Sequence, residues 1–387
     1  MVNKKHMSIL FTSAKIGSIE LKNRFVRSAT VECLASEDNR LTEKYYKLYE
    51  RLAKGGVGLI IPGNYFINSI GRAADKILVI DRDDVIDDLR KLTDIVHGYG
   101  AKIVGQINHG GRESDPRLIG TQPIGPSEVQ DKLTGTKPRE MSAQEIEETI
   151  KAFSSAAGRI KKAGFDGVQI HAAHGYLVNQ FLSAHTNRRT DQWGGSLENR
   201  MRFITRIYEE VRNEVGADFP VLTKINCEDQ ISGGITLEES ITMSKKLEAL
   251  GFDAIEVSGG IKETGFTTTK GDIPEELISF IPEKLQKAAE FKEGYFLPQA
   301  AAIKKSVSIP IISVGGMRHR EMMEQALLQG KADFISLSRP FIRQPNLVGQ
   351  MEKSPDADPI SCINCNRCTI EIALRYKPLL CYYSPEK

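Results

Sequence analysis

The chain has 387 residues, of which 40% are hydrophobic, and its 52 basic and 50 acidic residues leave a formal net charge of +2 at pH 7. This length and apolar content can bury one large core, such as that of a single α/β barrel. The balanced charge gives no electrostatic reason to expect a nucleic acid or an anionic membrane as partner, and it favours small-molecule chemistry.

The N-terminal stretch MVNKKHMSILF carries two lysines and a histidine before a very short apolar run, which is not the pattern of a secretion signal. No stretch approaches the roughly 20 apolar residues that span a bilayer. We therefore expect a cytoplasmic protein. Four of the six cysteines lie between residues 362 and 381, which in an intracellular chain indicates metal binding rather than disulfides.

Residues 10–23 alternate turn and apolar residues, as in a short hairpin that would cover the bottom of a barrel. After it, one unit recurs: a β-prone run, a polar or Gly-rich loop, and an amphipathic helix. The predicted strands span residues 25–29, 59–62, 103–107, 168–171, 221–225, 254–258, 309–314 and 334–337. Eight such units predict an α/β fold, a (β/α)8 TIM barrel.

Helices are predicted between these strands because apolar residues recur three or four positions apart. They span residues 42–52, 84–97, 143–162, 197–215, 237–250, 318–329 and 347–352. Ser142 and Glu145 have the spacing of a capping box at the start of one helix. The connection 259–294 is long, polar and punctuated by Gly and Pro, and we interpret it as a lid or substrate loop. A variable insertion that only covers the barrel rim is an equal alternative.

The sequence SPDADP at 354–359 breaks the last predicted helix, and the cysteine-rich segment follows it directly. We therefore predict a barrel domain over residues 1–355 and a cysteine-rich tail over residues 356–387.

Two positions late in the chain suggest a phosphate-bearing ligand. Gly315 and Gly316 follow the seventh predicted strand, and Ser338 and Arg339 follow the eighth, each pair before a helix. Glycines let backbone amides approach a phosphate, helix N-termini favour its charge, and Arg339 adds a bidentate donor. A tight turn without a ligand is the alternative for the glycine pair.

Three protic side chains gather where the fourth predicted strand ends, namely His171, His174 and Tyr176. The surrounding run HAAHGY, followed by NQFL and by NRRTDQWGGSLENR, resembles the signature of the old yellow enzyme family. These are FMN-dependent barrel oxidoreductases, and the resemblance covers about residues 8–350. It implies an FMN-dependent ene reductase that acts on α,β-unsaturated carbonyl compounds or related activated alkenes.

The resemblance also implies roles for individual residues. His171 and His174 match the pair that donates hydrogen bonds to the substrate's carbonyl, and Tyr176 matches the proton donor. Hydride addition to the β-carbon builds enolate charge on the oxygen, which two imidazole donors would stabilise while a phenol protonates the α-carbon. The residues that match flavin contacts are Ser28, Ala29, Thr30, Gly63, Gln106 and Lys224, although the family often has Pro where Ala29 stands. His109 and Arg112 belong to the same motif as Gln106, and structural roles are at least as expected for them.

The tail pattern Cys362-x2-Cys365-x2-Cys368-x12-Cys381 resembles the 4Fe-4S segment of trimethylamine dehydrogenase and 2,4-dienoyl-CoA reductase. Zinc or free thiols remain alternatives. Those relatives continue into domains for a second cofactor, whereas this sequence ends soon after Cys381, so no second flavin is expected. Cys33 and Cys227 are expected to be inert core thiols.

The electron donor is expected to be NAD(P)H, or a ferredoxin or flavoprotein that feeds the cluster. A homo-oligomer is expected, because the family often forms dimers or larger assemblies. Two other functions stay open: a flavin and iron-sulfur dehydrogenase that oxidises an amine or similar substrate, and an electron carrier or redox sensor with no small substrate.

Overall fold

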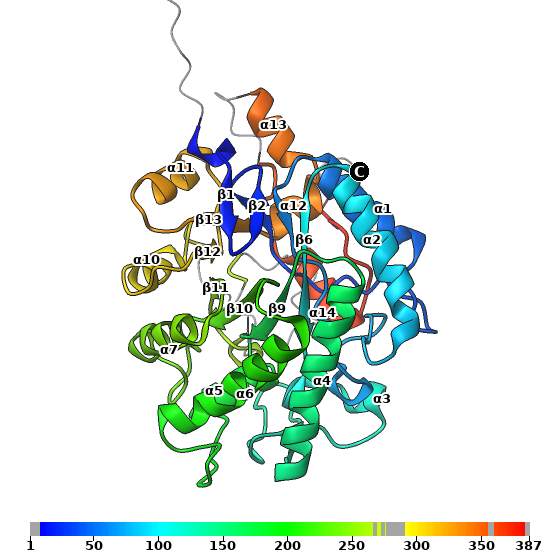
Figure 1. Ribbon diagram of the computed structural model, residues 1–387, viewed down its shortest axis with the longest axis vertical. Helices are drawn as coiled ribbons and strands as arrows, with labels where there is room; N and C mark the ends of the chain where they lie inside the picture. The colour runs from blue at the N-terminus through cyan, green and yellow to red at the C-terminus, as the bar shows by residue number, and fades with distance from the viewer. Residues whose placement is uncertain (1–7, 266–268, 272–274, 276–290, 355–359, 384–387) are drawn as a thin grey trace, which may run out of the picture.

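The structure, a computed structural model, describes residues 8–265, 269–271, 275, 291–354 and 360–383. In these residues eight parallel strands close into a barrel (Figure 1). They are β3 (Phe25–Arg27), β4 (Leu59–Ile60), β6 (Lys102–Asn108), β9 (Gly167–Ala172), β10 (Val221–Asn226), β11 (Ala254–Ser258), β12 (Ile311–Val314) and β13 (Phe334–Leu337). The ring closes because β13 pairs with β3 and β4 pairs with β6. The predicted TIM barrel is confirmed.

Helices lie around the outside of the barrel (Figure 1), and each contributes buried apolar side chains to the core. They are α1 (Glu43–Lys54), α2 (Ile86–Gly98), α4 (Ala143–Lys162), α6 (Leu197–Val215), α7 (Leu237–Leu250), α10 (Leu297–Lys304), α11 (Arg320–Leu328) and α13 (Leu347–Lys353). The capping box of Ser142 and Glu145 starts α4 as predicted. Helix α10 was not predicted, because its sequence LPQAAAIK has no amphipathic period.

Short helices, 3-10 turns and two-residue strands lie in the loops. They are helices α3 (Pro116–Ile119), α5 (Leu177–Leu182), α12 (Arg339–Arg343) and α14 (Arg367–Arg375), the 3-10 turns η1 (Ile9–Phe11), η2 (Ser69–Gly71), η3 (Asp83–Val85), η4 (Gly111–Glu113) and η5 (Lys262–Thr264), and strands β5 (Tyr65–Phe66), β7 (Ile124–Gly125) and β8 (Arg139–Glu140). Several of them lie in loops that follow barrel strands at their carboxyl ends, where a barrel builds its site.

An antiparallel hairpin of β1 (Ala14–Ile16) and β2 (Ile19–Leu21) closes the bottom of the barrel. Its apolar side chains belong to one buried cluster with residues from the beginnings of the strands, among them Val26, Leu59 and Leu222. Gly17 makes the tight turn with φ +53°. The predicted hairpin is therefore present.

The cysteine-rich segment packs on the barrel (Figure 1). Ile372 and Leu379 share a hydrophobic cluster with Cys33 and Phe66 of the barrel, and the Leu379 amide donates to the Glu32 carbonyl at 2.8 Å. The predicted domain boundary at 355–359 lies outside the described residues. So do residues 266–268, 272–274 and 276–290 of the predicted lid.

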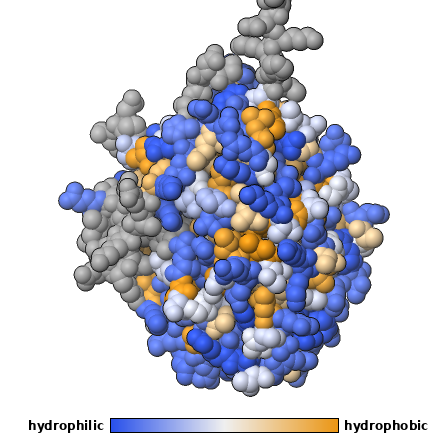
Figure 2. All heavy atoms as spheres, turned by 90° about the vertical axis from the view of Figure 1, so that its left-hand side faces the viewer, coloured by the Kyte–Doolittle hydropathy of each residue, from blue (hydrophilic) through white to orange (hydrophobic). Residues whose placement is uncertain are grey.

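The face shown in Figure 2 is mostly hydrophilic, with apolar residues in small groups among charged ones. In the described part of the chain no helix has both the length and the apolar character to cross a bilayer.

Candidate active site

A network of buried polar side chains lies inside the barrel. Lys224 on β10 pairs with Glu256 on β11, with 3.2 Å between Nζ and Oε2, and it donates to Ser28 Oγ at 2.8 Å. Ser28 in turn donates to Glu256 Oε1 at 2.8 Å, and Gln169 donates to Glu256 Oε2 at 3.1 Å. Gln106 donates to Gln169 at 2.7 Å. The buried cation is thus held in place and balanced by one buried carboxylate.

A cavity of about 290 Å³ adjoins this network, and we name it the inner cavity. The structure brings together around it all the residues that the sequence analysis assigned to catalysis or to cofactor binding. They are Ser28, Ala29, Thr30, Gly63, Gln106, His171, His174, Tyr176, Lys224, Gly315, Gly316, Ser338 and Arg339. Their positions fit a common site, while the role of each one stays a prediction.

The two histidines and the tyrosine form one wall of the inner cavity. The His171 ring lies edge-on to His174 and Tyr176, with ring centroids 5.1 Å and 4.9 Å apart. His174 has φ +64°, and its backbone amide donates to Asn226 Oδ1 at 3.1 Å. A non-glycine residue in this left-handed conformation needs such support. The turn that carries the three side chains is therefore held by its surroundings.

Both imidazoles are neutral at physiological pH. Burial, followed by the charges of His174 and Lys224, holds the pKa of His171 well below its ordinary value. Burial, followed by the charge of Lys224, lowers the pKa of His174 to about 3. A neutral imidazole offers one N–H donor. His171 Nδ1 accepts from the Ala173 amide at 3.3 Å, which leaves the proton on Nε2 as the donor.

The second histidine also has a defined partner. His174 Nε2 lies 2.7 Å from Ser258 Oγ. When the Ser258 hydroxyl donates to Nε2, the proton of His174 is on Nδ1. Burial raises the pKa of Tyr176, which the Lys262 cation opposes, so Tyr176 carries its proton at neutral pH. The wall can therefore offer two hydrogen-bond donors and one acid.

The far end of the inner cavity is built by the loops after β12 and β13. Gly315 and Gly316 have φ of +119° and +73°, and a Cβ on either would come within 2.7 Å and 2.6 Å of the Tyr295 ring. Glycine is required there because that ring packs directly on the backbone. Arg339 donates to the Lys270 carbonyl at 2.9 Å and to Asn366 Oδ1 at 2.5 Å. Arg339 thus connects the inner cavity to the cysteine-rich segment.

A second cavity of about 680 Å³, which we name the outer cavity, continues from the first. Both cavities share His174, Tyr176 and Lys262, together with Thr369, Ala373 and Tyr376 from α14 and its end. The cysteine-rich segment therefore forms part of the wall around the turn that carries His174 and Tyr176. The outer cavity is otherwise mostly lined by the η4–α3 region and by residues 133–136.

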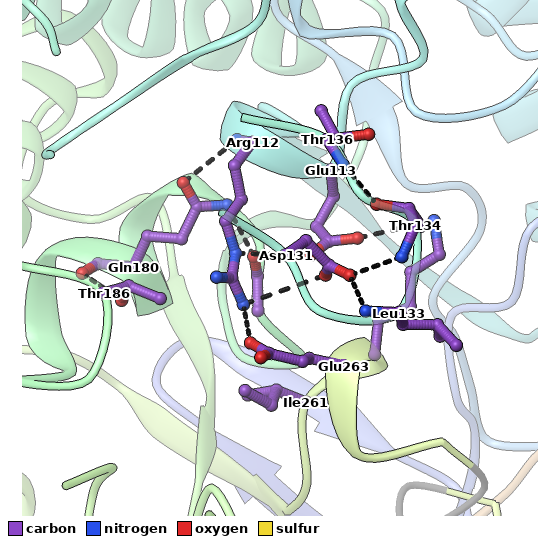
Figure 3. A network of polar contacts seen from close by, with 12 residues as sticks. Arg112, Glu113, Asp131, Leu133, Thr134, Thr136, Gln180, Thr186, Ile261 and Glu263 are labelled. Atoms are coloured by element: carbon purple, nitrogen blue, oxygen red, sulfur yellow. Dashed lines mark hydrogen bonds and ion pairs between the residues drawn. The ribbon is translucent and has the colours of Figure 1, made fainter. Parts of the chain in front are cut away.

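A cluster of buried charges borders the outer cavity (Figure 3). Arg112 pairs with Glu263 at 2.7 Å and lies 3.5 Å from Glu113 and 3.9 Å from Asp131. His185 Nε2 lies 2.9 Å from the same Glu263 oxygen. Burial and the neighbouring Asp131 raise the pKa of Glu113 to about 7, although Lys262 and Arg112 oppose the shift. His109, by contrast, is a buried ring whose Nδ1 accepts from the Gly111 amide.

The four tail cysteines surround one small cavity. Cys362, Cys365, Cys368 and Cys381 line it together with Arg339 and Arg343. Arg343 donates to Cys381 Sγ at 3.4 Å. Burial raises the pKa of the Cys368 thiol to about 11, which the Arg339 cation opposes. Among the described residues no three His, Cys, Asp or Glu side chains are placed to hold a metal ion.

The sequence analysis did not identify four residues that shape the site. Glu256 was not identified, although an acidic residue inside the otherwise apolar strand AIEVS indicates a buried polar site. Lys262, Glu113 and Tyr376 lie in loops or in the tail, where no periodic pattern marks them. Cys33 and Cys227 are buried, and burial raises the pKa of each thiol to about 12, in line with inert thiols.

Comparisons with known proteins agree with the barrel fold. The model of the NADH:flavin oxidoreductase / NADH oxidase family matches residues 9–357. The NADH oxidase of Thermoanaerobacter brockii is 37% identical over 363 residues, which are 93% of this chain and 53% of that protein. The NADPH dehydrogenase of Geobacillus sp. (strain WCH70) is 34% identical over 339 residues, which are 87% of this chain and 92% of that protein.

Among solved structures, a complex of 2-naphthoyl-CoA reductase with 2-naphthoyl-CoA has a TM-score of 0.88 and 30% identity. The match covers 97% of this chain and 57% of that chain. This chain therefore spans a little over half of the naphthoyl-CoA reductase and of the NADH oxidase, and most of the NADPH dehydrogenase.

Proposed function

The chain belongs to the NADH:flavin oxidoreductase / NADH oxidase family, the FMN-dependent oxidoreductases of the old yellow enzyme type, and from this premise we propose that it is an ene reductase. Its substrates are activated alkenes such as α,β-unsaturated carbonyl compounds. The observation that carries the proposal is the wall of two neutral imidazoles and one protonated phenol on the inner cavity.

The residues around the inner cavity fit FMN. The Gln106 amide and the buried Lys224 cation are suited to the polar edge of a flavin ring, and a cation there favours the anionic reduced form. Ser338, Arg339 and the Gly315 and Gly316 backbone supply donors suited to a phosphate. When bound by these residues, FMN would supply the hydride that an alkene reduction needs.

The protein's own side chains then handle the charge that develops on the substrate. His171 Nε2–H and the free N–H of His174 donate to the substrate oxygen and stabilise its developing negative charge. Tyr176 gives its proton to the α-carbon. Neutral donors suit an oxygen that becomes anionic, so the arrangement favours alkene reduction over amine oxidation.

We also propose that the tail holds a 4Fe-4S cluster. Four cysteines that share one cavity with two arginines support this, because cations favour thiolate ligands. NAD(P)H, or a ferredoxin or flavoprotein acting through the cluster, supplies electrons to a homo-oligomeric enzyme.

The first test is an absorption spectrum with iron and sulfide analysis of protein purified without oxygen. Flavin bands with about four iron per chain are the expected result. Flavin without iron would remove the cluster but keep the ene reductase, and no flavin would overturn the proposed function.

The second test measures reduction of 2-cyclohexen-1-one by variants that retain FMN. We expect His171→Ala and Tyr176→Phe each to lose at least about a hundredfold in rate. Tyr376→Phe is the matched control, because Tyr376 lines the same cavities but donates to Asp115 at 2.5 Å. Unchanged rates in the first two variants would contradict the assigned roles.

A further inference from the structure

We propose that Lys262 returns to Tyr176 the proton that this residue gives up in each turnover, and that Glu113 passes that proton to Lys262 from water in the outer cavity. The inference rests on the proposed function, in which Tyr176 is the acid. It goes further, because a phenol that has given up its proton must regain one before it can act again.

The backbone fixes Lys262 beside the catalytic turn. The Lys262 amide donates to the His174 carbonyl at 3.3 Å, and Ile261 forms an isolated parallel bridge with His174. A Cβ on Gly175 would come within 3.3 Å of Ile261, so the two segments are in close contact. The Lys262 side chain lines both the inner and the outer cavity, as does Tyr176. Lys262 is thus the cation placed at the junction of the two cavities.

Glu113 provides the next link of the relay. Its Oε2 lies 3.4 Å from Lys262 Nζ, and its side chain is 1% exposed, whereas the Lys262 side chain is 41% exposed. Glu113 also borders the outer cavity, along with Arg117, whose side chain is 80% exposed. The outer cavity therefore leads from the Glu113 carboxyl to the surface of the protein.

The surroundings keep Glu113 able to hold a proton. Arg112 of its own turn and Asp131 of the following loop face the Glu113 carboxyl (Figure 3). Lys262 of η5 faces it as well. Arg112 is engaged mainly by Glu263, at 2.7 Å. The Asp131 carboxylate repels a negative charge on Glu113. Burial and this repulsion raise the pKa of Glu113 to about 7, against the effects of Lys262 and Arg112.

The relay balances one proton per turnover and moves no electrons. The O–H bond of Tyr176 breaks as a C–H bond forms at the α-carbon, and a phenolate remains. The Lys262 ammonium protonates that phenolate and becomes an amine. The Glu113 carboxyl then protonates the amine, and its carboxylate takes up a proton from bulk solvent through the outer cavity, so that each turnover consumes one solvent proton. Burial raises the pKa of Tyr176, which favours return of a proton to its phenolate. Against the effect of burial, the neighbouring Glu113 raises the pKa of Lys262, so Lys262 carries its proton before each transfer.

The test follows product formation in the first turnovers of the FMN-loaded enzyme, with dithionite as reductant and 2-cyclohexen-1-one as probe. The first turnover uses the proton already on Tyr176, whereas later turnovers need the relay. We therefore expect Lys262→Met to show a burst of one product per FMN, followed by a steady rate lower by about ten- to a hundredfold. Lys262→Arg keeps the charge but holds its proton, and it should show the same burst.

Glu113→Gln is expected to show a burst with a smaller loss of steady rate, because water can still reach Lys262. Glu263→Gln is the matched control, since this neighbouring carboxylate pairs with Arg112 instead of Lys262. It should show no burst. In the Tyr176→Phe background, Lys262→Met should lower the rate no further, because both residues act on one proton.

Infrared difference spectra of the oxidised enzyme add a readout that does not depend on turnover. A protonated-carboxyl band that disappears as the pH rises through about 7 should be present in the wild type and missing in Glu113→Gln. Wild-type protein that reduces no alkene would overturn the proposed function and the relay with it. Wild-type turnover with neither burst nor slower rate in both Lys262 variants would overturn the relay alone.

Discussion

The titration of Glu113 makes the stability of the protein depend on pH in a defined direction. Its pKa rises from about 4.5 in the unfolded chain to about 7 in the fold. Between these values the folded state binds a proton that the unfolded state has lost, so stability falls as pH rises. The full contribution is present below pH 4.5 and is lost as the pH rises through 7. At about 1.36 kcal/mol per pKa unit, the change amounts to about 3 kcal/mol.

Glu113→Gln removes this titration while keeping the shape of the side chain. We expect the free energy of unfolding of the wild type, measured in urea between pH 4.5 and pH 8, to fall by about 3 kcal/mol relative to Glu113→Gln. Both proteins should carry the same FMN content, so that ligand binding cancels in the difference.

Glu263→Gln is the control, because the pKa of Glu263 is shifted in the opposite direction to that of Glu113. Although burial opposes it, hydrogen bonds from His185 and Arg112 lower the pKa of Glu263 to about 2. Its contribution is therefore fully present above pH 4.5 and is lost only as the pH falls toward 2. The difference between Glu263→Gln and the wild type should stay constant from pH 5 to pH 8. If the unfolding free energies of Glu113→Gln and the wild type changed equally with pH, the assignment of a protonated Glu113 would be refuted.

Three further predictions concern the inner cavity and the tail. Lys224→Met leaves Glu256 as a buried unpaired carboxylate, and it should cost about 3–5 kcal/mol of unfolding free energy and lower FMN affinity in equilibrium dialysis. Gly316→Ala should lower the melting temperature because its Cβ meets the Tyr295 ring at 2.6 Å, and Tyr295→Ala in the same chain should recover part of the loss. Cys368→Ser should lower iron and sulfide content in elemental analysis, whereas Cys33→Ser should leave both unchanged.

The barrel could be predicted from the sequence because each repeating unit carries its own signal. Strands buried on both sides appear as short β-prone runs, and the covering helices keep a helical period. Predicted bounds of α4, α6 and α7 match the structure. Helix α10 was not predicted because LPQAAAIK, with Pro298 and three alanines, has no alternation of apolar and polar residues at helical spacing.

Of the candidate site, the sequence predicted the residues that lie at or directly after the ends of barrel strands. His171 and Lys224 lie in strands, so their common position followed from the barrel itself. Lys262 and Tyr376 reach the cavities through η5 and through the end of α14. The bridge between Ile261 and His174 sets the position of Lys262, and the packing of the tail on the barrel sets that of Tyr376. No local sequence pattern indicates contacts between residues so distant in the chain.

Helix α14 has a consequence for how this enzyme can change over evolutionary time. Cys368 lines the cysteine cavity, while Thr369 and Ala373 on the same short helix line the inner and outer cavities. A shift of this helix that admits a larger substrate also moves a thiol. New substrate preferences are therefore more accessible through single side-chain replacements at Thr369 or Ala373 than through insertions or deletions. Libraries for directed evolution should vary these two positions and keep the length of the segment.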